Sequence, residues 1–290
     1  MDILVLLQEN TALLLIVVGV FSLLIGSFLN AVIYRVPIML ERSWRQDCQE
    51  MFGESNDNEN QETFNILTPR SQCPHCGHGI TALENIPVLS YLFLRGKCSS
   101  CHHKISIEYP LVETITMLLS VMLAWKFGYG MQLLASLVLL WTLIVLFMID
   151  AKTMFLPDNI TYPLLWLGIV INLDHTFIDL ESSVLGAIFG YLSLWSVYHI
   201  FRLITGKEGM GYGDFKLLAA IGAWGGWQIL PFVIMSSAFL GAILGSIWLF
   251  IIQKNKASQP IPFGPWLAIA GFIAIVWRNE VGQVMQLVFN

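Results

Sequence analysis

The sequence predicts an all-α polytopic membrane protein of about eight transmembrane helices, with a small zinc-binding domain between the first two. Hydrophobic residues make up 56% of the 290 positions and charged residues 12%, and the mean hydropathy is +0.68. An ordinary soluble domain is far less apolar. The apolar residues form continuous runs without the alternation of a lipid-facing strand. Each run is about long enough to cross a hydrocarbon core of roughly 30 Å as a helix.

Eight apolar runs are the predicted spans. They cover residues 12–34, 111–127, 131–149, 160–174, 182–204, 215–229, 231–252 and 263–278. The fourth and sixth are short and contain Gly or Pro, so seven spans with one re-entrant segment is the alternative. Asp2 and Glu9 stand where a signal peptide carries basic residues, so we expect the first run to remain as an anchor. The predicted divisions are a first span at 1–34, a loop at 35–110 and a helix bundle at 111–290.

Lys and Arg collect in alternate loops, which predicts the orientation because such residues are retained in the cytoplasm. The cytoplasmic set is Arg35, Arg42, Arg45, Arg70, Arg95, Lys97, Lys104, Lys152, Arg202, Lys207, Lys216, Lys254 and Lys256. Only Lys126 and Arg278 fall on the other side. We therefore expect a multi-pass protein of the inner (cytoplasmic) membrane, with the loop 35–110 inside the cell and lipid as its surroundings.

The loop 35–110 has two parts of different character. Residues 41–62 are acidic and rich in Asn and Gln, which predicts a solvated loop or a marginal helix. The second part contains two CxxC pairs, and its four cysteines are Cys73, Cys76, Cys98 and Cys101. Paired knuckles at this spacing favour one tetrahedral four-cysteine zinc site.

Two disulfides are the alternative to zinc, but they seldom persist in the reducing cytoplasm. Four histidines flank the knuckles and are expected at the surface or beside the ligands; replacement of one thiolate by a histidine is the alternative. They are His75, His78, His102 and His103. Cys48 has no partner in the pattern and is expected to be an ordinary thiol.

Two aspartates lie at membrane boundaries, where ionisable groups usually mark function. Asp150 ends the third predicted span and Asp214 opens the sixth, so both are expected at the cytoplasmic face. Two acids at one depth suit a site in which one holds a proton while the other activates water. Gly211 and Gly213 beside the second acid allow close backbone approach. Asp158 is a weaker third candidate.

Each aspartate also has a simpler interpretation. Asp150 alone is compatible with a polar residue beyond a helix end, whereas Asp214 and Asp158 are both compatible with helix N-caps. If the two acids do form a pair, helix direction favours Asp214 as the anion, because it lies at a helix N-terminus and Asp150 at a C-terminus.

Taken in order along the chain, several segments resemble the type IV prepilin peptidase family of bifunctional membrane enzymes. They are GSFLNAVIYRVP, CPHCGHGITALENIPVLSYLFLRGKCSSC, YPLVE, IDAKTMFLPD, GYGD and IPFGP. The resemblance covers nearly the whole chain. GxGD alone is weak evidence, but it is specific in this order and behind a CxxC pair.

This resemblance implies a GxGD aspartyl protease with Asp150 and Asp214 as its catalytic pair. Such enzymes remove a short basic leader from prepilins or pseudopilins after a Gly, and then methylate the new N-terminus with S-adenosylmethionine. In the family the cysteine-bearing loop is tied to methyl transfer, which makes Glu84 and Asn85 weak candidates there. Pilus assembly and type II secretion are the implied settings, and we expect no nucleic-acid partner.

Two other classes of function remain as alternatives. One is a proton-coupled transporter that uses the two aspartates as a relay. The other is a non-enzymatic assembly factor whose zinc module recruits partners. The aspartates at one face rather than the midplane, and the lack of an evident inverted repeat, favour the protease.

Overall fold

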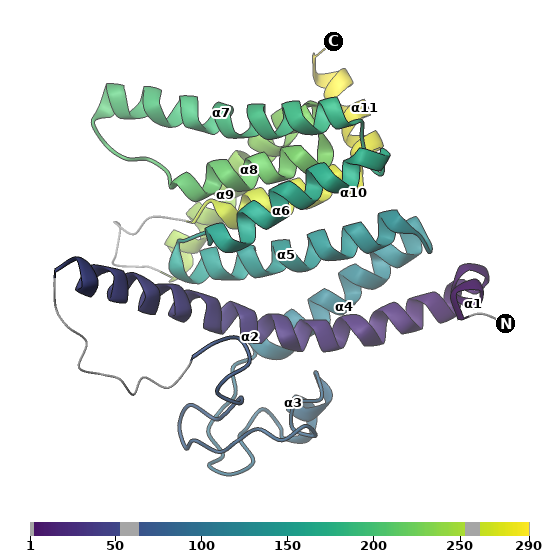
Figure 1. Cartoon of the computed structure of the whole chain (residues 1–290), viewed down its shortest axis with the longest axis vertical. Coiled ribbons are helices and arrows are strands. Elements are labelled where there is room, and N and C mark those ends of the chain that lie inside the picture. Colours follow the sequence, from purple (N-terminus) through teal and green to yellow (C-terminus); the bar gives the residue numbers. More distant parts are fainter. Residues whose placement is uncertain (1–2, 53–63, 253–261, 290) are drawn as a thin grey trace. The chain divides into compact units, whose positions relative to one another are not determined.

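The computed structural model describes residues 3–52, 64–252 and 262–289. Most of the described residues are helical, and the rest form turns and loops that contain two isolated β-bridges and no strand. It divides into two compact units, residues 1–129 and 130–290 (Figure 1). The predicted all-α fold is confirmed, and the four cysteines lie between the first two long helices as expected.

In the described part of the first unit there are four helices: α1 Ile3–Glu9, α2 Thr11–Met51, α3 Leu89–Phe93 and α4 Glu108–Phe127. The helix α4 therefore belongs with the first unit, whereas the sequence grouped residues 111–290 together. α2 starts at an Asn10 cap, whose side chain accepts from the Leu13 N–H at 3.0 Å.

The helix α2 continues beyond its predicted end at residue 34 as far as Met51. The acidic segment was expected to be a loop or a marginal helix, and its first part is helical. Exposed polar side chains line this extension, and Arg45 pairs with Glu41 one turn earlier at 2.6 Å. The remainder of that segment, residues 53–62, lies outside the described residues.

α2 and α4 pack closely in the first unit. Gly26 permits this, since a Cβ at that position would lie 2.8 Å from the Glu113 Cα. Further along α2, the Asn30 side-chain amide donates to the Tyr109 carbonyl at 3.1 Å. The start of α4 is thereby fixed against the second half of the apolar part of α2.

Arg35 holds the chain segment that leads into the cysteine module. Its guanidinium is buried and donates to three backbone carbonyls. The acceptors are Asn65 at 2.9 Å, Ile66 at 3.2 Å and Pro69 at 2.6 Å. A charged donor that satisfies several carbonyls fixes this segment to the end of the apolar part of α2.

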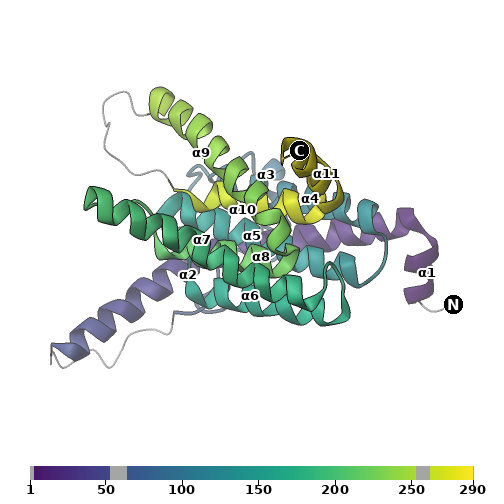
Figure 2. The same ribbon diagram turned by 90° about the horizontal axis from the view of Figure 1, so that it is seen from above.

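The second unit contains seven α-helices and two 3₁₀ turns among the residues described. They are α5 Met131–Thr153, α6 Asp158–Ile171, η1 Asn172–Asp174, α7 Leu180–Thr205, α8 Tyr212–Gly225, η2 Trp227–Ile229, α9 Leu230–Ile252, α10 Gly264–Val276 and α11 Arg278–Phe289. α8 lies among α6, α7 and α10 (Figure 2). From Asp214 to Gly225 every α8 residue except Lys216 is buried, so α8 is the centre of this unit.

Small residues allow α7 and α8 to touch through their backbones. A Cβ on Gly186 would collide with the Gly222 carbonyl, and a Cβ on Gly222 with the Gly186 carbonyl. One turn along, a Cβ on Gly190 would lie 2.6 Å from the Leu218 oxygen. Small residues at helix contacts are typical of membrane proteins, because they permit close packing without help from the hydrophobic effect.

Neighbouring side chains satisfy the carbonyls at the end of α8. The Ser183 hydroxyl and the Asn172 amide donate to the Ala223 oxygen at 2.6 and 3.0 Å. The end of α8 also donates a hydrogen bond, from the indole N–H of Trp224 to the Leu164 oxygen of α6 at 2.8 Å. Backbone groups inside a membrane protein need such internal partners, since no water is available.

The structure supports a multi-pass membrane protein but does not confirm eight spans. Five helical stretches are long and apolar enough to cross a bilayer: Thr11–Met51, Glu108–Phe127, Met131–Thr153, Leu180–Thr205 and Trp227–Leu244. α6 and α8 have 14 residues each and α10 has 13. At 1.5 Å per residue they are about 20 Å long, shorter than a core of roughly 30 Å.

The predicted sixth span, residues 215–229, also ends early in the structure. α8 stops at Gly225, and Gly226, with φ +86°, turns the chain into η2. A residue with a side chain would be strained in this conformation. Lys254 and Lys256, which contributed to the predicted orientation, lie outside the described residues.

The contact between α7 and α8 gives a first testable prediction. Gly222→Ala places a methyl group against the α7 backbone, and we expect overpacking of this kind to cost about 1–3 kcal/mol. Thermal unfolding of the purified protein in detergent should show a lower midpoint. Gly282→Ala is the matched control, because nothing lies within 4 Å of its added Cβ. Equal midpoints for the two variants would contradict the close contact.

Candidate active site and metal centre

Asp150 lies in the last turn of α5 and is 5% exposed. Its Oδ2 atom is buried without a hydrogen-bond partner among the described residues. α5 ends just after it, where Met154 takes a left-handed conformation and donates to the Asp150 carbonyl at 2.8 Å. A buried acid with an unsatisfied oxygen lowers the stability of the fold, so packing alone does not explain an aspartate at this position.

Asp214 lies in the first turn of α8 and is 7% exposed. Gly211 is the N-cap of this helix, and its carbonyl accepts from the Asp214 N–H at 3.3 Å. The backbone N–H of Gly211 also faces the Asp214 carboxylate. Asp214 is therefore inside the first turn and is not the N-cap that the sequence alone allowed.

The structure brings the two predicted acids together in the second unit. The two acids share a neighbour, because Leu156 packs against Gly213, next to Asp214, and against Gly264, which meets the Asp150 carboxylate. α10 connects them, since it packs against both α5 and α8. Two buried carboxylates that interact can share a proton, and this arrangement suits general acid and base chemistry.

Gly264 at the start of α10 is a site residue that sequence reasoning did not single out. A Cβ at this position would lie 2.6 Å from the Asp150 Oδ2 atom, and the Gly264 N–H faces the same carboxylate. The motif IPFGP contributed to the resemblance, but it contains no ionisable group. A search for polar side chains therefore could not find it.

Leu156 is a second residue that the sequence did not reveal. It is buried in the connection between α5 and α6. A Cβ on Gly213 would lie 2.8 Å from the Leu156 Cβ, and one on Gly264 would lie 3.2 Å from its Cδ1. Glycines from two helices thus make room for one leucine between the elements that hold the two acids.

The position of α10 removes the basis for assigning roles from helix direction. That argument placed Asp214 at a helix N-terminus and Asp150 only at a C-terminus. In the structure the N-terminus of α10 faces Asp150, so both carboxylates lie near the positive end of a helix dipole. The dipoles no longer distinguish the anion from the acid.

Asp158, the weaker third candidate, has a different environment. It is the first residue of α6, with Pro157 as the N-cap, and its carboxylate is half exposed. Both of its oxygens accept from the Lys216 ammonium group at 2.7 Å. This ion pair between α6 and α8 accounts for Asp158 without a catalytic role.

The four cysteines of the first unit form a compact cluster. All four sulfur atoms lie within 4.8 Å of one another. Cys73 and Cys101 are 3.8 Å apart, and Cys76 and Cys98 are 4.0 Å apart. A tetrahedral zinc ion with Zn–S bonds of about 2.3 Å needs sulfur separations of about 3.8 Å. The residues therefore fit a four-thiolate metal site.

Backbone N–H groups within each knuckle favour the thiolate form that metals bind. Those of His75 and Cys76 donate toward Cys73 and lower the pKa of its thiol to about 7. The N–H of Cys101 is the main contributor to a lowered pKa at Cys98. The lowered pKa values give these two sulfurs a greater tendency to ionise than an ordinary thiol.

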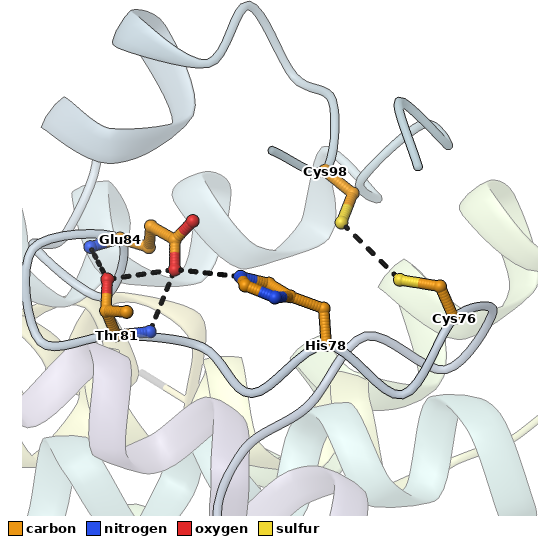
Figure 3. Close-up of polar contacts among 5 residues, drawn as sticks. All are labelled: Cys76, His78, Thr81, Glu84 and Cys98. Atoms are coloured by element: carbon orange, nitrogen blue, oxygen red, sulfur yellow. Dashed lines mark hydrogen bonds and ion pairs between the residues drawn. The ribbon is translucent and has the colours of Figure 1, made fainter. Parts of the chain in front are cut away.

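The flanking residues lie beside the cluster rather than in it. The histidine rings of His75 and His103 stack with centroids 3.4 Å apart, and neither belongs to the group of sulfurs. The Nε2 atom of His78 lies 3.5 Å from the Glu84 carboxylate (Figure 3). Cys48 is exposed on α2 and forms no disulfide, as expected of an ordinary thiol.

Glu84 is held inside a turn of the cysteine module. Hydrogen bonds from the Ser99 side chain and from the N–H and hydroxyl of Thr81 lower the pKa of its carboxyl to about 2. Its neighbour Asn85 is exposed. These contacts explain Glu84 as a turn-forming residue, and a part in methyl transfer stays a prediction for both.

Comparisons with known proteins match both units. Residues 20–127 match the "Bacterial Peptidase A24 N-terminal domain", and residues 137–246 match the "Type IV leader peptidase family". A protein of Aeromonas hydrophila named prepilin leader peptidase/N-methyltransferase is 53% identical over 264 residues, which is 91% of each chain. The chain belongs to the type IV leader peptidase family.

Other relatives with the same name extend the match within the leader peptidase family. One from Pseudomonas aeruginosa is 53% identical over 90% of this chain and 89% of its own. One from Dichelobacter nodosus is 52% identical over 95% and 96%. The comparison with solved structures gave no match. Membership in this family makes the chain an enzyme of the peptidase class.

The cysteine cluster of this leader peptidase family member gives a second prediction. We expect the purified protein to contain about one zinc ion, and Cys98→Ser to lose it, because one of four ligands is removed. Metal analysis by mass spectrometry measures this directly. Cys48→Ser, outside the cluster, should keep the metal. Metal-free protein with a Cys73–Cys76 disulfide would reject the site.

Proposed function

We propose that this chain is an aspartyl endopeptidase that uses Asp150 and Asp214 to remove the short basic leader of type IV prepilins or pseudopilins after a Gly. The main support is that both acids are buried on separate helices and that Leu156 packs between the glycines beside them, Gly213 and Gly264. They lie in the unit that matches the leader peptidase family. The names of the relatives supply the class of substrate.

The proposed chemistry needs one protonated and one ionised carboxylate. The ionised member takes a proton from water as the oxygen attacks the scissile carbonyl, and the protonated member donates to the carbonyl oxygen. The carboxylate that took the proton from water then passes that proton to the leaving amine. Burial of Asp150 and Asp214 supports this, because loss of solvent disfavours a second negative charge in the same buried site.

The proposed site opens to the cytoplasm, because the loops on its side of the membrane are rich in Lys and Arg. Arg35, Lys104 and Arg202 are among the residues that support this orientation. A prepilin leader is basic and would stay on the same side, while its apolar helix enters the bilayer. The bond to be cut would then lie at the depth of the two aspartates.

We further propose that the enzyme methylates the new N-terminus with S-adenosylmethionine, as the names of its relatives indicate for them. The methyl donor would supply the transferred group, and the cysteine module would support this half of the reaction. Four thiolates leave no open position on a zinc ion, so the metal would be structural.

Charge-preserving and neutral substitutions test the aspartates. In Asp150→Asn and Asp214→Asn we expect cleavage of a synthetic prepilin to fall by at least about 100-fold, the scale of general acid and base catalysis. Mass spectrometry of the products measures both cleavage and methylation. Glu at either position should also abolish cleavage, because the longer side chain moves the carboxylate. A proton-coupled transporter would keep part of its activity with Glu.

Asp158→Asn is the matched control for these variants. It removes an acid at the same end of the bundle and weakens only the pair with Lys216. We expect near-normal cleavage. If Asp150→Asn or Asp214→Asn cleaves as well as this control, the aspartyl mechanism is wrong.

The proposed roles give a further prediction at Gly264. Gly264→Ala places a methyl group 2.6 Å from the Asp150 Oδ2, whereas Gly271→Ala on the same helix places one 2.5 Å from the Ile221 side chain. Both should lower the unfolding temperature. Only Gly264→Ala should lower kcat per folded molecule, since it displaces the carboxylate. Equal kcat values would show that Gly264 acts through packing alone.

A further inference from the structure

The cysteine module exposes large apolar side chains on and around the short helix α3. Phe93 is 84% exposed, Leu83 77%, Leu92 65% and Leu89 52%. Soluble surfaces rarely carry such a patch, and where one occurs it marks a protein or membrane contact. The proposed peptidase and methyl-transfer steps assign no role to these residues.

The depth of α3 can be read from its contact with α4. The Val88 N–H, directly before α3, donates to the Glu113 Oε2 atom at 2.7 Å. Glu113 is buried in the candidate span Glu108–Phe127, about 7.5 Å along the axis from its first residue at 1.5 Å per residue. The start of α3 is therefore beside the membrane-crossing part of α4.

α2 gives a second, independent limit on this depth. Gly26 packs against the backbone of Glu113, and it lies in the continuous apolar run of α2. Arg35, the first charged residue after that run, is roughly 13 Å further along the helix. Half of a hydrocarbon core is about 15 Å thick, so Glu113 and its partner Val88 lie within one leaflet.

The contact also explains two costly features of the first unit. An acid inside a spanning helix is expensive unless it has a partner, and the Val88 N–H provides one for Glu113. Val88 has φ +59°, a strained conformation for a β-branched residue. Strain of this kind persists only where surrounding contacts hold the backbone in place.

We propose that residues 83–93 form a membrane foot, in which Leu89, Leu92 and Phe93 insert among lipid acyl chains in the leaflet where α4 begins. Lipid is the occupant that the depth favours, because these side chains extend from a segment fixed beside α4 within the hydrocarbon layer. Arg95 and Lys97 follow at once and are exposed, which suits the anionic headgroups above that layer. The cysteine module is thus seated on the bilayer.

A photoreactive side chain tests the membrane foot directly. p-Benzoylphenylalanine replaces Phe93 in the full chain, in nanodiscs of phosphatidylethanolamine and phosphatidylglycerol. Ser100, an exposed residue of the second cysteine knuckle, carries the same probe as the control. After irradiation, mass spectrometry should find several-fold more lipid adduct at position 93 than at position 100. Zinc content confirms that each variant is folded, and Leu92 serves as the probe position if Phe93 does not tolerate it.

Other occupants give different products. Equal lipid yields at the two positions, or adducts to a second copy of the chain, would overturn the proposal. Loss of the lipid adduct when an apolar prepilin fragment is added, with a peptide adduct in its place, would assign the face to substrate instead.

Glu113→Ala should lower the lipid yield at Phe93, whereas Glu113→Gln, which keeps a carbonyl acceptor, should preserve it. An unchanged yield in Glu113→Ala would remove Glu113 as the anchor.

Discussion

The backbone contact between α7 and α8 is the constraint on which the second unit depends. Gly186 and Gly222 leave no space for a side chain between the two helices. α8 can therefore be buried on all sides although it has only 14 residues. Because its end is closed by hydrogen bonds from Ser183 and Asn172, it needs no water at that end. A helix held this firmly provides a fixed support for Asp214.

The other acid depends on an element that comes much later in the chain. α10 packs against both α5 and α8, and its first residue, Gly264, meets the Asp150 carboxylate. Leu156 occupies the space that Gly213 and Gly264 leave open. The separation of the two acids is thus set by apolar and glycine contacts. Precise placement of polar groups by a packed surrounding shell is what an acid and base pair requires.

The sequence indicated the candidate acids and the cysteine cluster, and missed the residues that place them. Apolar runs indicated helices, and the spacing of the cysteines indicated the cluster around Cys73. Hydropathy carries no record of tertiary contacts, so the role of Gly264 and the early end of α8 at Gly226 were not readable. The helix dipole argument for Asp214 was likewise incomplete, because the helix that faces Asp150 begins more than a hundred residues later.

Arg35 has a consequence for how the length of this chain can vary. Its three hydrogen bonds to residues 65–69 hold the segment that enters the cysteine module against α2, so the module does not rely on the intervening chain for its position. Loop closure entropy rises only slowly with length, by about 0.6 kcal/mol for each doubling. We therefore expect changes of chain length between Met51 and Phe64 to leave the cysteine module in place, because its contact with Arg35 lies after that stretch.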